Sequence, residues 1–174
     1  MQYTRVTRKQ KDYRSVAELM LTAFPPEERI PMWVLTLLSR KRNINFYAWY
    51  DNGEFCGITY TIESEKMIYL LYFAVNTHQR SRGYGSRIIQ ELKQIAENKE
   101  IILNVENPDP SAENHAQRVQ RIAFYKRNGF YQSDFTLRIA GTDYLVFSTS
   151  TAPNKAEFSH LLGKYPIGKI QMPG

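Results

Sequence analysis

A run of apolar and aromatic residues in the middle of the chain, Met67 to Val75, constrains the fold more than any other segment. Unbroken apolar character over this length is typical of a strand that is buried on both faces, so we expect it at the centre of a sheet. Apolar residues then recur at helical spacing from Ile88 to Ala96, and a short apolar strand follows at Ile101 to Val105. A strand, a helix and a second strand form a crossover unit, which predicts that the two strands are parallel neighbours.

The flanking segments predict further strands and helices around this unit. Alternating patterns indicate strands at residues 2–7, 45–50, 55–62, 130–139 and 144–148. Helical spacing and end signals indicate helices at residues 13–24, 27–38 and 109–128, the last beginning at Asp109 and stopped by Gly129. We therefore expect a mixed α/β (α+β) domain at residues 1–148, followed by a C-terminal tail at 149–174 of unknown role with a short helical patch.

Composition narrows the classes of protein that remain. There is no run of 18 uncharged apolar residues and no signal peptide, so we expect neither a membrane span nor secretion. The single cysteine, Cys56, cannot form an internal disulfide, which favours a reducing, cytoplasmic setting. The net charge of +6 suggests a polyanionic partner, and nucleic acid is one candidate. The basic residues are scattered, however, and form no stripe with interleaved aromatics. A phosphorylated cofactor would explain the cluster in the middle of the chain equally well.

The turn between the buried strand and the following helix, Gln79 to Ser86, carries the clearest chemical signal. Gly83 and Gly85 permit positive φ and a close approach of a ligand to the backbone, so several N–H groups can point at one anion. The start of a helix and two arginines, Arg80 and Arg82, add favourable charge for phosphate. A dinucleotide fingerprint would need a third glycine at position 88, and a P-loop would need Gly-Lys-Ser/Thr; both are absent. The alternative is a tight turn with solvated arginines.

Two motifs in the right order make the chain resemble the GNAT superfamily of acetyl-CoA-dependent N-acetyltransferases. Arg80-x-x-Gly83-x-Gly85 is similar to the pyrophosphate motif of that family, and the stretch from Arg121 to Phe130 is similar to its helix that ends in a tyrosine before Gly-Phe. The resemblance covers about residues 2–148. It implies the GNAT fold, a mostly antiparallel twisted sheet with a parallel, splayed central strand pair and flanking helices, with acetyl-CoA as co-substrate and no metal.

The resemblance also implies site residues for the cofactor. The expected coenzyme A contacts are Phe73, Ala74, Val75, Arg80, Ser81, Arg82, Gly83, Tyr84, Gly85 and Ser86. Tyr125 corresponds to the family tyrosine that protonates the departing thiolate; the alternative is that it packs in the core beside Phe124. Many relatives carry an asparagine seven residues before this tyrosine. This chain has Arg118 there, and Asn114, one turn earlier, is the expected replacement.

On the acceptor side the sequence says less. An amine that arrives as an ammonium ion must be deprotonated before it attacks, so carboxylates are the candidate bases: Glu106 as a catalytic residue, and Glu27 and Glu28 as acceptor-binding residues. Each of them has a solvated surface charge as its alternative. A small-molecule or peptide amine is expected as acceptor, and a homodimer stays open. The alternatives to an enzyme are a catalytically silent acyl-CoA-binding sensor or scaffold, and a nucleic-acid binder.

Overall fold

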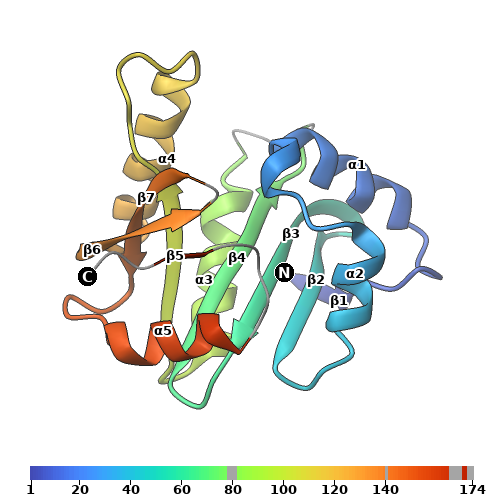
Figure 1. Cartoon of the computed structure of the whole chain (residues 1–174). Helices are drawn as coiled ribbons and strands as arrows, with labels where there is room; N and C mark the ends of the chain where they lie inside the picture. Colours follow the sequence, from blue (N-terminus) through green and yellow to red (C-terminus); the bar gives the residue numbers. More distant parts are fainter. Residues whose placement is uncertain (78–81, 140, 165–169, 172–174) are drawn as a thin grey trace. The chain divides into compact units, whose positions relative to one another are not determined.

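The computed structural model of the chain describes residues 1–77, 82–139, 141–164 and 170–171 (Figure 1). Gln79, Arg80 and Ser81 of the expected turn therefore lie outside the described residues. The chain divides into two compact units, of which the first contains residues 1–63 and 70–97, and the second contains residues 64–69 and 98–174. Each unit is described by itself below.

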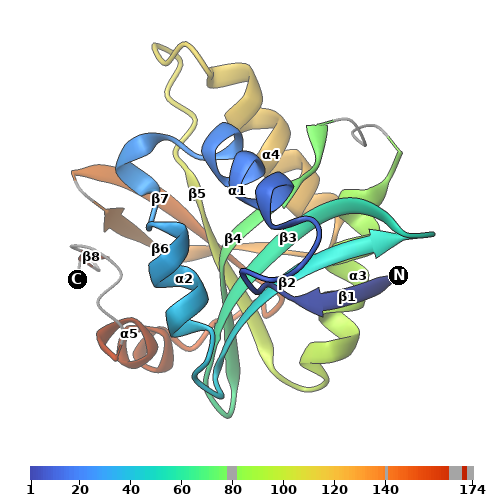
Figure 2. The same cartoon turned by 90° about the vertical axis from the view of Figure 1, so that its right-hand side faces the viewer.

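The first unit holds the N-terminal half of the sheet in the order β1-β2-β3-β4. Its strands are β1 (Gln2–Arg5), β2 (Ile44–Asp51), β3 (Glu54–Glu63) and most of β4 (Met67–Val75). Its helices are α1 (Tyr13–Ala23), the 3-10 helix η1 (Pro26–Glu28), α2 (Met32–Leu38) and α3 (Tyr84–Ala96). Helices α1 and α2 cover one face of these strands, and α3 covers the other (Figures 1 and 2).

Both faces of β3 are buried, because helices cover both. On the α1 and α2 face, the ring of Tyr60 packs edge-on against Phe46 of β2 at 5.3 Å. On the α3 face, the indole of the fully buried Trp49 donates a hydrogen bond of 2.8 Å to Thr59. This hydrogen bond satisfies the buried N–H of the indole. Strand β3 is therefore packed on both faces within this unit.

The second unit is built on the parallel pair that the sequence predicts. The first residues of β4 pair in parallel with β5 (Glu100–Glu106), from Met67↔Glu100 to Tyr69↔Ile102, which confirms the crossover. The strand order is β4-β5-β7-β6-β8, with β6 (Tyr131–Ile139), β7 (Thr142–Ser148) and β8 (Ile170–Gln171) antiparallel. Helices α4 (His115–Arg127) and α5 (Lys155–Gly163) lie on opposite faces of these strands (Figures 1 and 2). The splay of β4 and β5 beyond these pairs concerns the relative position of the two units and stays a prediction.

Two of the predicted helices begin later than the sequence indicated. The helix predicted at 27–38 is split, because Pro31 lacks an N–H donor and its ring disfavours a helical backbone at Ile30; α2 starts after it. The helix predicted from Asp109 starts at His115 instead. The carboxylate of Asp109 accepts hydrogen bonds from the backbone N–H and the hydroxyl of Ser111, at 2.8 and 2.7 Å, and this local turn competes with the helix.

The C-terminal segment contributes to the core of the second unit. Helix α5 buries Phe158, Leu161 and Leu162, and the ring of Phe158 packs against Tyr69 of β4 at 5.2 Å. Strand β8 pairs with β6 through Arg138↔Gln171 and Ile139↔Ile170. The helical patch predicted in this segment is therefore confirmed, while the domain boundary at residue 148 stays a prediction.

Candidate functional site

Gly83 forms the N-cap of α3 in the left-handed conformation, with φ at 76°. A residue with a side chain would be strained at this φ, so the backbone conformation explains why position 83 is a glycine. Among the described residues no side-chain hydrogen bond caps this helix. The first N–H groups of a helix have no acceptor within it, so they suit an anion. The expectation of positive φ at Gly85 is wrong: Gly85 is the second residue of α3. It leaves the helix start without a side chain there.

Asp51, at the end of β2, holds the first turn of α3 in place. Its carboxylate accepts hydrogen bonds from the Arg87 guanidinium at 2.8 and 3.0 Å and from the Tyr84 hydroxyl at 3.1 Å. The Arg87 hydrogen bond lowers the pKa of Asp51, and the hydrogen bond to Asp51 raises the pKa of Tyr84. The hydroxyl of Tyr84 thus serves to position the helix. In the sequence, Asp51 stands out only as the first residue of Asp51-Asn52-Gly53, a hairpin-turn signal between two predicted strands.

Gly57 of β3 lets the end of β4 and the start of α3 approach closely. A Cβ atom at this position would lie 2.4 Å from the carbonyl oxygen of Ala74, 3.1 Å from Cδ1 of Ile88 and 3.2 Å from Cα of Val75. Ala74 is buried and Val75 is half-buried. The close approach of Gly57 therefore restricts the position of the backbone at these two residues. Phe73, Ala74 and Val75 are the strand residues expected to contact the cofactor. The signal that sequence reasoning missed is a glycine inside a strand, which often marks a close backbone approach.

Tyr72 of β4 fixes the loop that carries the candidate acceptor residues. Its hydroxyl donates a hydrogen bond to the carbonyl oxygen of Glu28 and accepts one from the backbone N–H of Ile30 at 3.1 Å. Its ring packs edge-on against Phe24 at 4.8 Å, and burial raises its pKa to about 12. Glu27, on the same loop, is exposed, and Glu28 is half-buried. Tyr72 therefore determines where these two carboxylates are presented.

We expect Tyr72→Phe to lower the free energy of unfolding by about 1–2 kcal/mol, because it removes two hydrogen bonds at a buried position. Thermal unfolding measures this loss. The substitution should also displace Glu27 and Glu28, since the loop is no longer tied to β4. A variant with wild-type stability would mean that these hydrogen bonds contribute nothing.

Tyr125 lies on α4 in the second unit and is buried, with 7% of its surface exposed. Its ring packs edge-on against Phe124 at 5.2 Å and Phe130 at 5.6 Å. Burial raises its pKa to about 12, and the nearby Arg121 charge lowers it by a smaller amount. The phenol is therefore fully protonated at neutral pH, as a proton donor must be. The ring also packs against two phenylalanines, so core packing and the predicted proton donation are compatible for this residue.

Glu106, at the end of β5, is held by two arginines of α4. Its carboxylate forms ion pairs with Arg118 at 3.0 Å and Arg121 at 3.2 Å. Arg118 also donates to the side-chain oxygen of Asn114 at 2.7 Å and to the carbonyl of Asn107 at 2.9 Å. Arg118 thus ties the start of α4 to the end of β5, and the side-chain oxygen of Asn114 is engaged by it. This network gives Glu106 and Asn114 a structural function beside the predicted ones.

Comparison with known proteins agrees with these features. A model of the acetyltransferase (GNAT) family matches residues 13–130, which is more than half of the chain. The chain belongs to the GNAT acetyltransferase family. No match is found among curated proteins.

Solved structures show the same fold. A protein described as a GNAT-family acetyltransferase from Bacteroides thetaiotaomicron is 22% identical, with a TM-score of 0.77 over 95% of this chain and 96% of its own. An aminoglycoside 6'-N-acetyltransferase complexed with coenzyme A is 14% identical, with a TM-score of 0.64 over 88% and 99%. A ribosomal-protein alanine N-acetyltransferase from Escherichia coli is 17% identical, with a TM-score of 0.58 over 88% and 95%. The fold is therefore that of the GNAT acetyltransferases.

Two further features are absent from the part of the chain that the structure describes. None of the helices within the described ranges is long and apolar enough to cross a membrane. No cluster of three or more His, Cys, Asp or Glu side chains that could hold a metal ion is found in the same ranges.

Proposed function

We propose that the protein transfers an acetyl group from acetyl-CoA to a primary amine, directly within a ternary complex. The observation that carries this proposal is the left-handed Gly83 at the uncapped start of α3, beside the exposed Arg82. Backbone N–H groups at a helix start and a neighbouring guanidinium are well suited to the pyrophosphate of coenzyme A. The family membership supports the same cofactor. The lone Cys56, which is buried, fits a cytoplasmic enzyme.

The proposed reaction needs one base and one acid. A base removes a proton from the ammonium form of the acceptor, and the free amine attacks the carbonyl carbon of the thioester. The new C–N bond forms, the tetrahedral intermediate collapses, and the C–S bond breaks. The thiolate leaves with the bonding electron pair and takes a proton from the phenol of Tyr125. The nitrogen, which carries two protons after the attack, loses one to solvent as the intermediate collapses, and the phenol of Tyr125 regains a proton from solvent. The net products are the amide, coenzyme A and the proton that the base took from the ammonium form.

The carboxylates differ in their suitability for the acceptor side. Glu106 already neutralises two guanidinium groups, which reduces its attraction for a further cation. Glu27 is exposed on the loop held by Tyr72, and Glu28 is beside it. We therefore assign acceptor recognition to Glu27 and Glu28 first. The neighbours named for an aminoglycoside and for a ribosomal protein leave both small-molecule and peptide amines as acceptors.

Replacing Glu27 or Glu28 with glutamine should raise the KM for the acceptor by about tenfold, because a nearby carboxylate attracts an ammonium group. Glu106→Gln should act mainly on thermal stability, since two arginines lose their partner. Steady-state kinetics on an identified acceptor measures the first effect. If neither loop variant changes KM, the acceptor is bound elsewhere.

Two glycines with similar backbone conformation allow a controlled test of the proposed acetyl-CoA site. Gly83 and Gly53 both have positive φ, at 76° and 81°, and a Cβ atom at either would meet no atom within 4 Å. We expect Gly83→Ala to weaken acetyl-CoA binding by about tenfold or more, because the strained turn relaxes and displaces the N–H groups. Gly53→Ala carries the same backbone strain in the β2–β3 hairpin and should leave binding unchanged. Calorimetry with acetyl-CoA that gives equal affinities for the two variants would reject the turn as the phosphate site.

A catalytically silent acyl-CoA-binding sensor is the alternative function. It predicts the same result in the glycine experiment but no transfer to any amine. The turnover experiments in the Discussion separate the two.

A further inference from the structure

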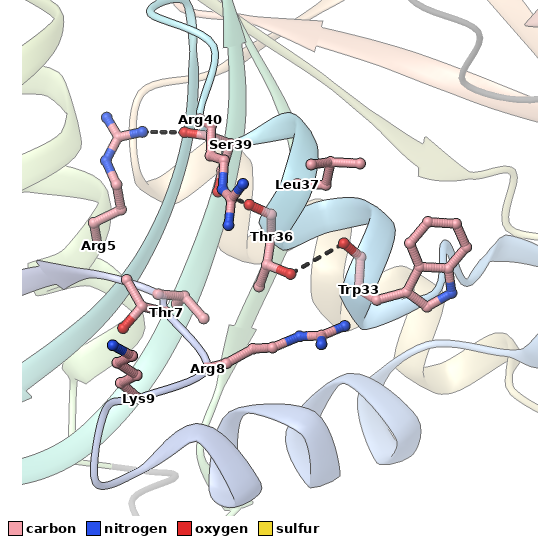
Figure 3. A pocket seen from close by; sticks show the side chains of 10 residues that line it. Arg5, Thr7, Arg8, Lys9, Trp33, Thr36, Leu37, Ser39 and Arg40 are labelled. Carbon is pink, nitrogen blue, oxygen red and sulfur yellow. Dashed lines mark hydrogen bonds between the residues drawn. The ribbon is translucent and has the colours of Figure 1, made fainter.

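A second candidate binding site lies in the first unit, in a pocket of about 500 Å³ between the turn that follows β1 and helix α2. Figure 3 shows that its walls come from two segments far apart in the sequence, Arg5 to Lys9 on one side and Trp33 to Arg40 on the other. No residue of this lining belongs to the phosphate turn or is one of the acceptor candidates. The volume is in the range that holds a drug-sized or nucleotide-sized molecule.

The lining is strongly cationic. Arg5, Arg8, Lys9 and Arg40 line the pocket, and none of the described residues that line it is acidic. Among the described residues, no carboxylate forms an ion pair with Arg8, Lys9 or Arg40, and all three are exposed. Three unneutralised cations around one concave surface attract an anion strongly.

Arg5 has a different function, which is to fix the floor of the pocket. Its guanidinium donates to the carbonyl oxygens of Ser39 and Ile44 and to the side-chain oxygen of Asn45. The carbonyl of Ser39 follows the end of α2, where free carbonyl groups would repel an anion. Because Arg5 occupies this carbonyl, the repulsion is reduced. On the Arg5 to Lys9 side, the side-chain oxygen of Gln10 accepts a hydrogen bond from the backbone N–H of Thr7 at 3.2 Å.

Trp33 and Leu37 add an apolar surface to the mouth of the pocket. They lie one turn apart on α2, and 56% of Trp33 and 51% of Leu37 are exposed to solvent. In Figure 3 the side chain of Arg8 extends across the pocket toward the Trp33 side. An exposed indole beside an arginine is a surface on which a flat aromatic ring can stack.

We propose that this pocket binds a nucleoside phosphate, with the phosphate groups held by Arg8, Lys9 and Arg40 and the base stacked on Trp33. The guanidinium fork of arginine matches two phosphate oxygens at once. A purely inorganic anion would leave the Trp33 and Leu37 surface exposed, and an apolar ligand would leave the three cations unused. A nucleoside phosphate uses both halves of the site. The same chemistry is presented by a free nucleotide and by a single-stranded nucleic acid.

The two tryptophans of the chain provide a direct readout. Trp49 is fully buried and hydrogen-bonded to Thr59, whereas Trp33 is at the pocket, so a ligand that stacks there quenches Trp33 alone. We expect guanosine 5'-diphosphate to quench the fluorescence of the wild-type protein, with the quench lost in Trp33→Leu. Calorimetry should show a Kd for this nucleotide about tenfold higher in Trp33→Leu and in each of Arg8→Gln and Arg40→Gln. Arg127→Gln, an equal charge change in the second unit, should bind as the wild type does.

Three ligands separate the outcomes. Inorganic pyrophosphate should bind more weakly than the nucleotide, and equal binding would overturn the proposed stacking and with it the proposal. A single-stranded oligonucleotide that binds more tightly than the free nucleotide identifies a nucleic-acid strand as the ligand; the opposite order identifies a free nucleotide. Binding that survives in Arg8→Gln and Arg40→Gln would place the ligand outside this pocket and overturn the proposal. None of these results depends on acetyl transfer.

Discussion

Replacing Gly57 with alanine should destabilise the protein by about 3 kcal/mol, which corresponds to a fall in Tm of about 6–12 °C for a chain of this size. The added methyl group would lie 2.4 Å from the carbonyl oxygen of Ala74, and this neighbour is backbone that cannot rotate away. The end of β4 must therefore move, or β3 must. Because Ala74 is among the expected cofactor contacts, we expect acetyl-CoA affinity to fall as well.

Gly163→Ala is the matched control for this substitution. A Cβ atom at Gly163 would meet no atom within 4 Å, and the residue lies at the end of α5 without positive φ. Alanine there should leave Tm unchanged or raise it slightly, since alanine has the higher helix propensity. Calorimetric unfolding of both variants tests the point. If Gly57→Ala unfolds at the wild-type temperature, β3 and β4 are less closely packed than the structure describes.

Tyr125→Phe should lower kcat by about 10²-fold, because it removes the proton donor for the departing thiolate and keeps the ring. Stability should be nearly unchanged. The rings of Phe124 and Phe130 retain their partner, and no hydrogen bond of the Tyr125 hydroxyl is found within the described residues. Acetyl-CoA affinity should also be retained.

Tyr72→Phe provides the contrast, because burial raises the pKa of both tyrosines to about 12 but only the Tyr72 hydroxyl is tied into hydrogen bonds. We expect kcat to fall in one variant and stability to fall in the other. Since the raised pKa keeps Tyr125 protonated, this group should cause no loss of activity on the alkaline side until the pH approaches about 12. Full turnover in a folded Tyr125→Phe protein would remove the residue from the mechanism and leave proton delivery to water.

Much of the fold could be predicted because its signals are local. The apolar run of β4, the periodicity of α3 and the turn at Asp51 each depend on a few neighbouring residues. The predicted starts of α2 and α4 were wrong, because contacts of single residues decide them. Pro31 and the side chain of Asp109 decide these boundaries through single contacts that outweigh helix periodicity.

The site was predicted in part, and the missing residues act across the sheet. Gly83 has the conformation that the motif required, whereas Gly85 does not. Gly57 positions the end of β4, Asp51 the first turn of α3, and Tyr72 the loop at Glu28, each through contacts with residues far away in sequence. These contacts join strands to a helix and a loop, and such tertiary packing is not contained in a local sequence pattern. Arg118 illustrates the same limit, because its ion pair with Glu106 links β5 to α4.

The most direct test of the central claim is to incubate the purified protein with acetyl-CoA and a panel of primary amines, and to follow free thiol and the mass of each amine together. We expect at least one amine to gain one acetyl group for every molecule of coenzyme A released, with the rate reduced by about 10²-fold in Tyr125→Phe. Binding of acetyl-CoA without acetylation of any small-molecule or peptide amine in the panel would contradict the enzyme assignment and favour the sensor.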